Sequence, residues 1–142
     1  MRHLLPLFFI MSFTGCAVKQ SSAQETYGAQ IGIVNHTGKF IYEATVNGRG
    51  GALMERWGAG TAGLCCVDLP LARRAGLQVR LEWDTPEGDK HEYHEKMVNL
   101  EIYEEGASLY LHFFPDGSAR AIVTGYSPAS PHHPIPHRGK PK

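Results

Sequence analysis

The chain has 142 residues, and its 14 lysines and arginines balance its 14 aspartates and glutamates, so the formal net charge is zero. This balance excludes the basic footprint of a nucleic-acid-binding protein, and a hydrophobic content of 42% excludes a wholly disordered chain. We therefore expect one domain with its own hydrophobic core.

The first fifteen residues predict a lipoprotein signal peptide. Arg2 precedes an apolar run from Leu4 to Phe13, which is long enough for a secretory signal but too short for a membrane span of about 20 residues. Thr14 and Gly15 then lead into Cys16, in a pattern that resembles the bacterial lipobox. We expect cleavage before Cys16 and lipid attachment to its thiol. The alternatives are an ordinary signal peptide with a chance cysteine and a buried N-terminal helix.

The residues after the cysteine predict where the mature protein resides. Ala17 stands where an aspartate would signal retention at the inner membrane, so we expect an outer-membrane lipoprotein that faces the periplasm. Residues 16–26 are small and polar, which predicts a tether between the lipid and the domain. Membrane contact is expected through the lipid anchor, since more than one acyl chain makes anchoring stable.

Residues 27–126 predict a β domain. Short segments of alternating polar and apolar residues are separated by turns, and one of them ends at the strong turn signal Asn47-Gly48. Inward-facing positions are expected at Leu77, Val79, Leu81, Trp83, Leu109, Leu111 and Phe113. About seven short strands without a helical period predict an all-β antiparallel sandwich or partly open barrel.

The glycine-rich residues 48–63 predict a long loop, with a short helical turn around 53–57. Arg49, Arg56 and Trp57 lie in this loop, and arginine and aromatic residues are enriched at protein interfaces. They are therefore the candidate partner-binding residues. For Trp57 a second interpretation is equally open, namely that it folds back and closes one end of the domain.

Cys65 and Cys66 are adjacent, and neighbouring residues of a regular strand point to opposite faces. A disulfide between them would need a distorted backbone. The pair is either a redox pair or vicinal disulfide, or two small side chains that are buried or bonded to another chain. The second interpretation is favoured.

The histidines do not predict a metal centre. His91 and His94 are three residues apart, so in a strand they would point to opposite faces. His132, His133 and His137 lie in residues 127–142, a segment rich in proline and histidine that predicts an extended, largely disordered tail. No cofactor is expected.

Catalysis is not expected either. Ser108, His112 and Asp116 are the residue types of a hydrolytic triad, but no nucleophile elbow surrounds the serine. Asp116 is followed by glycine, as in a turn. The sequence predicts a protein that is not an enzyme.

Several segments together resemble one family. They are NHTGKFIYEATVNGRGG, CCVDLP, AGLQVRLEW, LYLHFFPDGSARAIVTGYSP and HHPIP. In this order they are similar to the DUF3304 family of bacterial lipoproteins, over about residues 31–136. Members often have a tryptophan in the segment that reads LARRA here, so a role for that tryptophan does not carry over.

The resemblance implies a function. Some members of the family resemble immunity proteins encoded beside phospholipase effectors of type VI secretion, which neutralise the toxin in the periplasm. It therefore implies a protein toxin of the lipase type as partner. The mechanism we expect is occlusion, in which a loop-bearing end or sheet edge covers the toxin's active-site entrance or locks its lid. The alternative is a structural outer-membrane lipoprotein of envelope assembly that has no toxin partner. The sequence leaves the oligomeric state open.

Overall fold

The computed structural model describes residues 24–142. The predicted signal peptide, Cys16 and all but the last three residues of the predicted tether lie outside the described residues. Within residues 24–142, eight strands form one sheet. They are β1 (Thr26–Asn35), β2 (Ile41–Val46), β3 (Arg49–Met54), β4 (Leu64–Pro70), β5 (Gln78–Asp84), β6 (Tyr93–Tyr103), β7 (Ser108–Phe113) and β8 (Ala119–Thr124).

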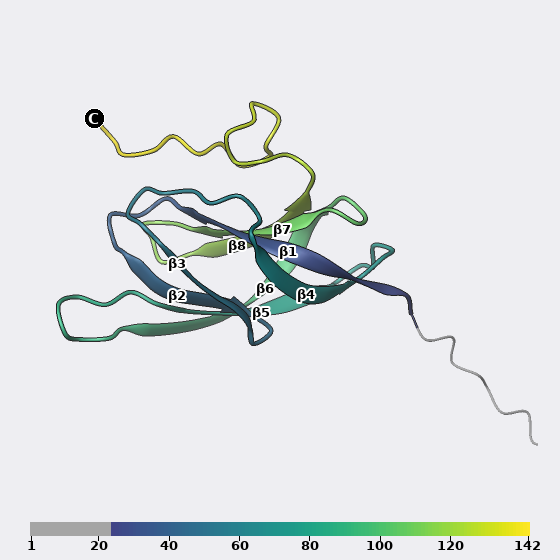
Figure 1. The fold of residues 1–142 in the computed structure, drawn as a ribbon, viewed down its shortest axis with the longest axis horizontal. Coiled ribbons are helices and arrows are strands. Elements are labelled where there is room, and N and C mark those ends of the chain that lie inside the picture. The colour runs from purple at the N-terminus through teal and green to yellow at the C-terminus, as the bar shows by residue number, and fades with distance from the viewer. Residues whose placement is uncertain (1–23) are drawn as a thin grey trace, which may run out of the picture.

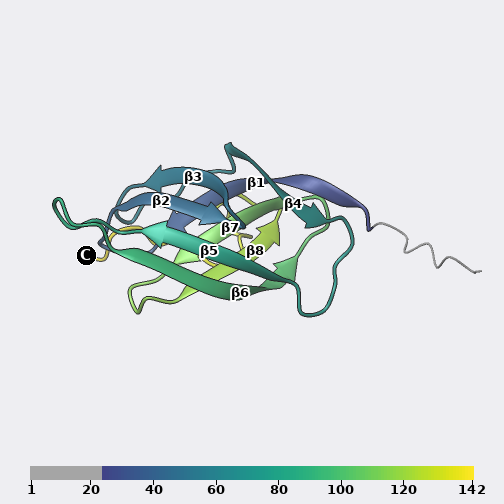
Figure 2. The ribbon, with the colours of Figure 1, turned by 90° about the horizontal axis from the view of Figure 1, so that it is seen from below.

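The sheet curls into a nearly closed barrel, which confirms the predicted all-β fold (Figures 1 and 2). The strand order is β3-β2-β5-β6-β8-β7-β1-β4, and the two edge strands β3 and β4 approach each other. The sheet is mixed rather than antiparallel throughout, because β1 pairs with β7 and β6 pairs with β8 in parallel. The long strand β6 joins the two halves, since it pairs first with β5 and then with β8.

The core lies inside the barrel. All of the predicted inward-facing positions except Leu77 are buried, and Leu77 packs against the core while partly exposed. The other large members of this core are Ile31, Ile33, Ile41, Val46, Val67, Leu69, Leu100 and Val123. Each such side chain contributes about 1.5–3 kcal/mol to folding. The core therefore makes a rigid scaffold of the sheet.

The glycine-rich loop is shorter than predicted, and it contains no helical turn. Arg49–Met54 forms β3, which pairs with β2 through a tight turn at Asn47 and Gly48, both with positive φ. The φ angles of Gly50 and Gly51 are 109° and 96°, which only glycine adopts easily, and the register with β2 shifts at this point. The glycines therefore permit an irregular edge strand where a loop was predicted.

The prediction of a disordered tail is also wrong. Residues 127–142 lie over the outer side of β1, β7 and β8 (Figure 1). His133 is only 3% exposed and Ile135 only 6%, and Ile135 completes a second apolar cluster with Val34, Tyr110 and Ile122. These three strands bear apolar residues on both faces, so their outer face needs a cover. The tail provides it with a single isoleucine held among prolines.

Gly32 permits close packing of β1 beneath this second cluster. A Cβ at this position would lie 2.5 Å from ring atoms of Tyr110 and 3.0 Å from the carbonyl oxygen of Gly60. We predict that Gly32→Ala lowers the free energy of unfolding by about 1–3 kcal/mol, because the buried ring must move. Chemical denaturation measures this. Gly63→Ala is the matched control, since its Cβ would meet nothing closer than 3.7 Å. Equal stability of both variants would contradict this packing.

Candidate functional site

The residues predicted to bind a partner do not form one cluster. Arg49 begins β3 and Arg56 follows its end, so their backbones are separated by about 20 Å of extended chain. Both side chains are exposed. They lie at opposite ends of an edge strand of the barrel.

Trp57 is half-buried and folds back onto the domain. Its amide donates to the carbonyl of Thr37 over 3.0 Å, and its own carbonyl accepts a hydrogen bond from His137 Nε2 at 2.8 Å. The indole ring lies beside Gly38, where a Cβ would be 3.3 Å from Cζ2. Of the two interpretations of Trp57, this placement matches the one in which it closes an end of the domain.

Cys65 and Cys66 lie at the start of β4, an edge strand, and are joined to each other by a disulfide. The peptide bond between them is cis, which departs from the regular strand assumed in the sequence analysis. Cys65 is exposed and Cys66 is partly exposed. Neither side chain is part of the core.

Carboxylates from three strands meet on the outer face of the sheet. The ladder places Glu43 of β2 opposite Asp84 of β5, and Glu82 of β5 opposite Glu95 of β6. Because partners in a ladder point to the same face, these side chains share one surface. Within this group, Glu82 has a basic neighbour, since Arg80 Nη2 lies 3.8 Å from its Oε2.

Exposed apolar residues lie beside these carboxylates. Tyr93 of β6 is 77% exposed, Met97 of the same strand 56% and Tyr42 of β2 53%. The His91 ring links two of them, with its centroid 5.7 Å from those of Tyr42 and Tyr93. We call this surface the acidic–aromatic face, made of Tyr42, Glu43, Glu82, Tyr93, Glu95 and Met97. This face was not predicted from the sequence, although the outward positions of the alternating strands indicate it.

A pocket of about 490 Å³ opens on this face. Its lining includes all four carboxylates, with Thr45, Trp83, Tyr93 and His94. The neighbouring edge strand leaves room for it, because Gly51 has no side chain where a Cβ would lie 3.4 Å from Glu43 Oε1. The lining of the pocket is therefore rich in carboxylates.

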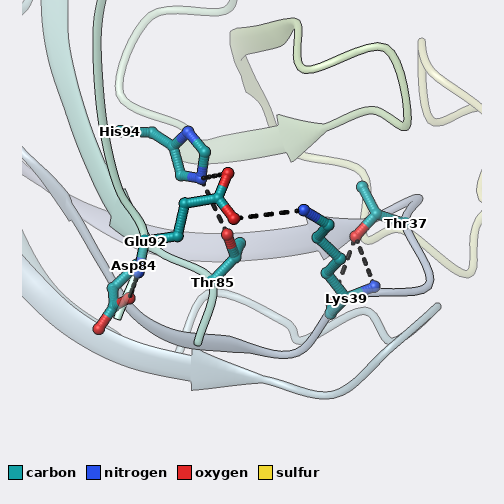
Figure 3. A network of polar contacts seen from close by, with 6 residues as sticks. All are labelled: Thr37, Lys39, Asp84, Thr85, Glu92 and His94. Carbon is teal, nitrogen blue, oxygen red and sulfur yellow. Dashed lines mark hydrogen bonds and ion pairs between the residues drawn. The ribbon is translucent and has the colours of Figure 1, made fainter. Parts of the chain in front are cut away.

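A polar network holds the adjacent end of the barrel (Figure 3). The Glu92 carboxylate lies between Lys39 Nζ and His94 Nε2, at 3.5 Å from each. His94 Nε2 is also 2.8 Å from Thr85 Oγ1. Buried Asp84 binds the His91 ring through Oδ2 and the amide of Glu92 through Oδ1. These contacts fix the β5–β6 turn and thereby one side of the acidic–aromatic face.

Ser108, His112 and Asp116 are not arranged as a hydrolytic triad. Both ring nitrogens of His112 contact other imidazoles, those of His36 and His133, so neither faces Ser108. Hydrogen bonding from the side chain of Ser118, followed by that from its backbone amide, lowers the pKa of the Asp116 carboxyl. His91 lies before β6, where it binds Asp84, while the ring of His94 on β6 stacks on Trp83.

Within residues 24–142, no group of three or more histidine, cysteine or carboxylate side chains is arranged to hold a metal ion. The same residues contain no helix that is long and apolar enough to cross a membrane.

Comparison with known proteins identifies one family. The family model described as "Protein of unknown function (DUF3304)" matches residues 34–121, which is more than half of the chain. The match spans β2 to β7 and ends within β8, so it covers the strands that carry the acidic–aromatic face. No curated protein and no solved structure gives a significant match.

Proposed function

The chain belongs to the DUF3304 family, and from that premise we propose that it is a lipid-anchored, periplasm-facing immunity protein that binds and neutralises a lipase-type effector of type VI secretion by occlusion. The acidic–aromatic face is the proposed contact surface. The lipid on Cys16 is the proposed anchor.

The observation that carries this proposal is the exposure of Tyr93, Met97 and Tyr42 on one face of a rigid sheet. Tyrosine and methionine are enriched in the cores of protein interfaces, where their burial stabilises a complex. A surface whose backbone is already fixed by the barrel loses little entropy on binding. A binding protein fits this arrangement better than an enzyme does.

The charges of the face specify the partner's chemistry. Glu43, Glu82 and Glu95 surround the apolar residues, so the partner's complementary surface is expected to carry lysines and arginines. Arg49 and Arg56 stand at the two ends of the neighbouring strand β3 and are proposed as rim contacts. A standard interface buries about 800 Å² on each partner, which this side of the barrel can supply.

The anchor fits the same function. An inhibitor of a lipid-attacking toxin must work at the membrane, where the toxin finds its lipid substrate. A lipid on Cys16 would hold the inhibitor at that membrane. Residues 16–26 would let the domain stand off the membrane by at most about 40 Å when fully extended.

Co-expression tests this function. The toxin is a type VI secretion effector of the lipase type, directed to the periplasm, and the readout is survival of the cells. We expect the wild type to rescue the cells. The Cys16→Ser variant should not rescue them, and neither should a form that lacks its first fifteen residues and therefore stays in the cytoplasm. Immunoblots confirm that all forms accumulate equally.

Two outcomes would contradict the proposal. Rescue by the cytoplasmic form would contradict the proposal that the protein acts in the periplasm. Failure of the accumulated, lipidated wild type to rescue would favour a structural envelope lipoprotein.

A further inference from the structure

The disulfide between Cys65 and Cys66 joins two neighbouring residues, so it cross-links no separate parts of the fold. A disulfide stabilises a protein mainly by closing a loop in the unfolded chain, and the gain grows with the length of that loop. A bond between adjacent residues closes no such loop. Its stabilising effect is therefore expected to be small, and stability does not explain why the chain has this bond.

Other contacts hold β4 in place. After the cysteines, β4 pairs with β1 from Val67 to Pro70, and the side chains of Val67 and Leu69 are buried in the core. The hydroxyl of Tyr103 donates a hydrogen bond to the carbonyl of Pro70. These contacts do not involve the disulfide. We therefore expect β4 to keep its place when the disulfide is opened.

The disulfide lies where an attacking thiol can reach it. Cys65 is exposed and Cys66 is partly exposed, and both belong to a strand at the edge of the sheet. The register between β4 and β1 shifts at these two residues. Gly28 of β1 has no side chain where a Cβ would lie 3.7 Å from Cys66 Sγ. Exposed disulfides are the ones that exchange readily with thiols.

We propose that Cys65 and Cys66 form a thiol–disulfide exchange site on the folded domain, and that its reaction partner is a dithiol. One thiolate of the dithiol attacks Sγ of the exposed Cys65, and the bond between the two cysteines breaks. Cys66 leaves as a thiolate and takes up a proton. The second thiolate of the dithiol then attacks the sulfur that its own molecule bonded to Cys65, and Cys65 leaves in the same way.

Electrons and protons are conserved in this exchange. The dithiol loses two electrons and becomes a disulfide, and the protein gains both electrons. The two protons of the dithiol end on Cys65 and Cys66. The inference stands on the position of the disulfide and does not depend on the proposed toxin partner.

The adjacency of the two cysteines selects dithiols over monothiols. When a monothiol bonds to Cys65, the freed thiol of Cys66 is one residue away and attacks the mixed disulfide, which restores the original bond. Such an intramolecular step is favoured by a high effective concentration. A dithiol carries a second thiol that competes with Cys66 on equal terms. It therefore completes the reduction, whereas a monothiol is expelled.

Counting free thiols by mass spectrometry tests the site. In the full chain with Cys16→Ser, Cys65 and Cys66 are the remaining cysteines. The oxidised protein is treated with dithiothreitol, reduced thioredoxin or glutathione at equal concentrations of thiol groups, and N-ethylmaleimide then labels the free thiols. We expect two labels per chain with either dithiol and the unlabelled mass with glutathione. The circular dichroism spectrum should stay that of the folded protein.

The rate of reduction tests whether the site is open in the folded state. The rate with dithiothreitol should change by less than about threefold when urea unfolds the chain, because the disulfide is already accessible.

Two single-cysteine variants in the Cys16→Ser background form a matched pair. Cys66→Ser should keep one glutathione on Cys65 after treatment with glutathione disulfide, because no neighbouring thiol expels it. Cys65→Ser should react more slowly, since Cys66 is only partly exposed. The adduct should not accumulate when both cysteines are present.

Four results would overturn the site. The first is a protein that keeps two free thiols after oxidation, and the second is a disulfide that dithiothreitol opens only after urea has unfolded the chain. The third is loss of the folded spectrum on reduction, which would make the disulfide a structural element. The fourth is reduction by glutathione as complete as that by dithiothreitol. Reduction by dithiothreitol but not by thioredoxin would assign the site to small dithiols.

Discussion

Replacing Asn35 with aspartate is expected to lower the free energy of unfolding by about 3–5 kcal/mol. Asn35 is fully buried at the end of β1. Its amide nitrogen donates to the carbonyls of Lys39 and Glu55, at 2.8 and 3.0 Å, and its oxygen accepts from the amide and hydroxyl of Thr37. A carboxylate keeps the two accepted bonds but loses both donated ones, and it places a charge against two carbonyl oxygens.

Urea denaturation followed by circular dichroism measures this loss. Because the substituted carboxyl is buried without a cation, its pKa should be raised in the folded state. The folded state then binds the extra proton, so the loss is largest near neutral pH and shrinks toward pH ~4.

The matched control is Asn99→Asp, the same chemical change at an exposed residue whose oxygen still accepts from Gln78. It should change stability by less than about 0.5 kcal/mol. Equal stability of the two variants would show that the hydrogen bonds of Asn35 to Lys39 and Glu55 do not stabilise the end of β1.

Replacing both Tyr93 and Met97 with alanine is expected to weaken toxin binding by at least about thirtyfold, which corresponds to about 2 kcal/mol. Both side chains lie on β6 with more than half of their surface exposed, so they contribute little to the stability of the unbound domain. Stability should therefore stay close to that of the wild type. Surface plasmon resonance with the immobilised toxin measures the affinity.

Tyr126→Ala is the control for this variant. Tyr126 is 48% exposed and lies by the tail, where its ring contacts His132, away from the acidic–aromatic face. Its loss should leave binding unchanged. If the β6 variant binds as the wild type does while Arg49→Ala and Arg56→Ala weaken binding, the contact surface is the edge strand β3 instead.

Local patterns were sufficient to predict most of the strands and their inward faces, but not the edge strand β3, whose glycines indicated a loop. Leu109, Leu111 and Phe113 alternate along β7, and the barrel interior accepts all three. The same alternation places Tyr110 and His112 outward, where exposure would be expected. They are buried because residues more than twenty positions later return to cover them, and no local pattern encodes that return.

The acidic–aromatic face was only partly predictable. Alternation along β5 directs Glu82 outward, and the β5–β6 hairpin brings Glu95 beside it. Glu43 joins them because β2 pairs with β5 across two intervening strands, a long-range choice that sequence spacing does not reveal. Arg56 and Trp57 were selected for their residue types, yet the conformation of Trp57 depends on Thr37 and His137, which come from other segments.

Titration of the toxin's lipase activity with the purified mature protein tests neutralisation most directly. Stoichiometric occlusion predicts that activity falls linearly and reaches zero at about one equivalent, with the Tyr93 and Met97 double variant inhibiting only in large excess. Full lipase activity at a tenfold excess of the wild-type protein would contradict an immunity function.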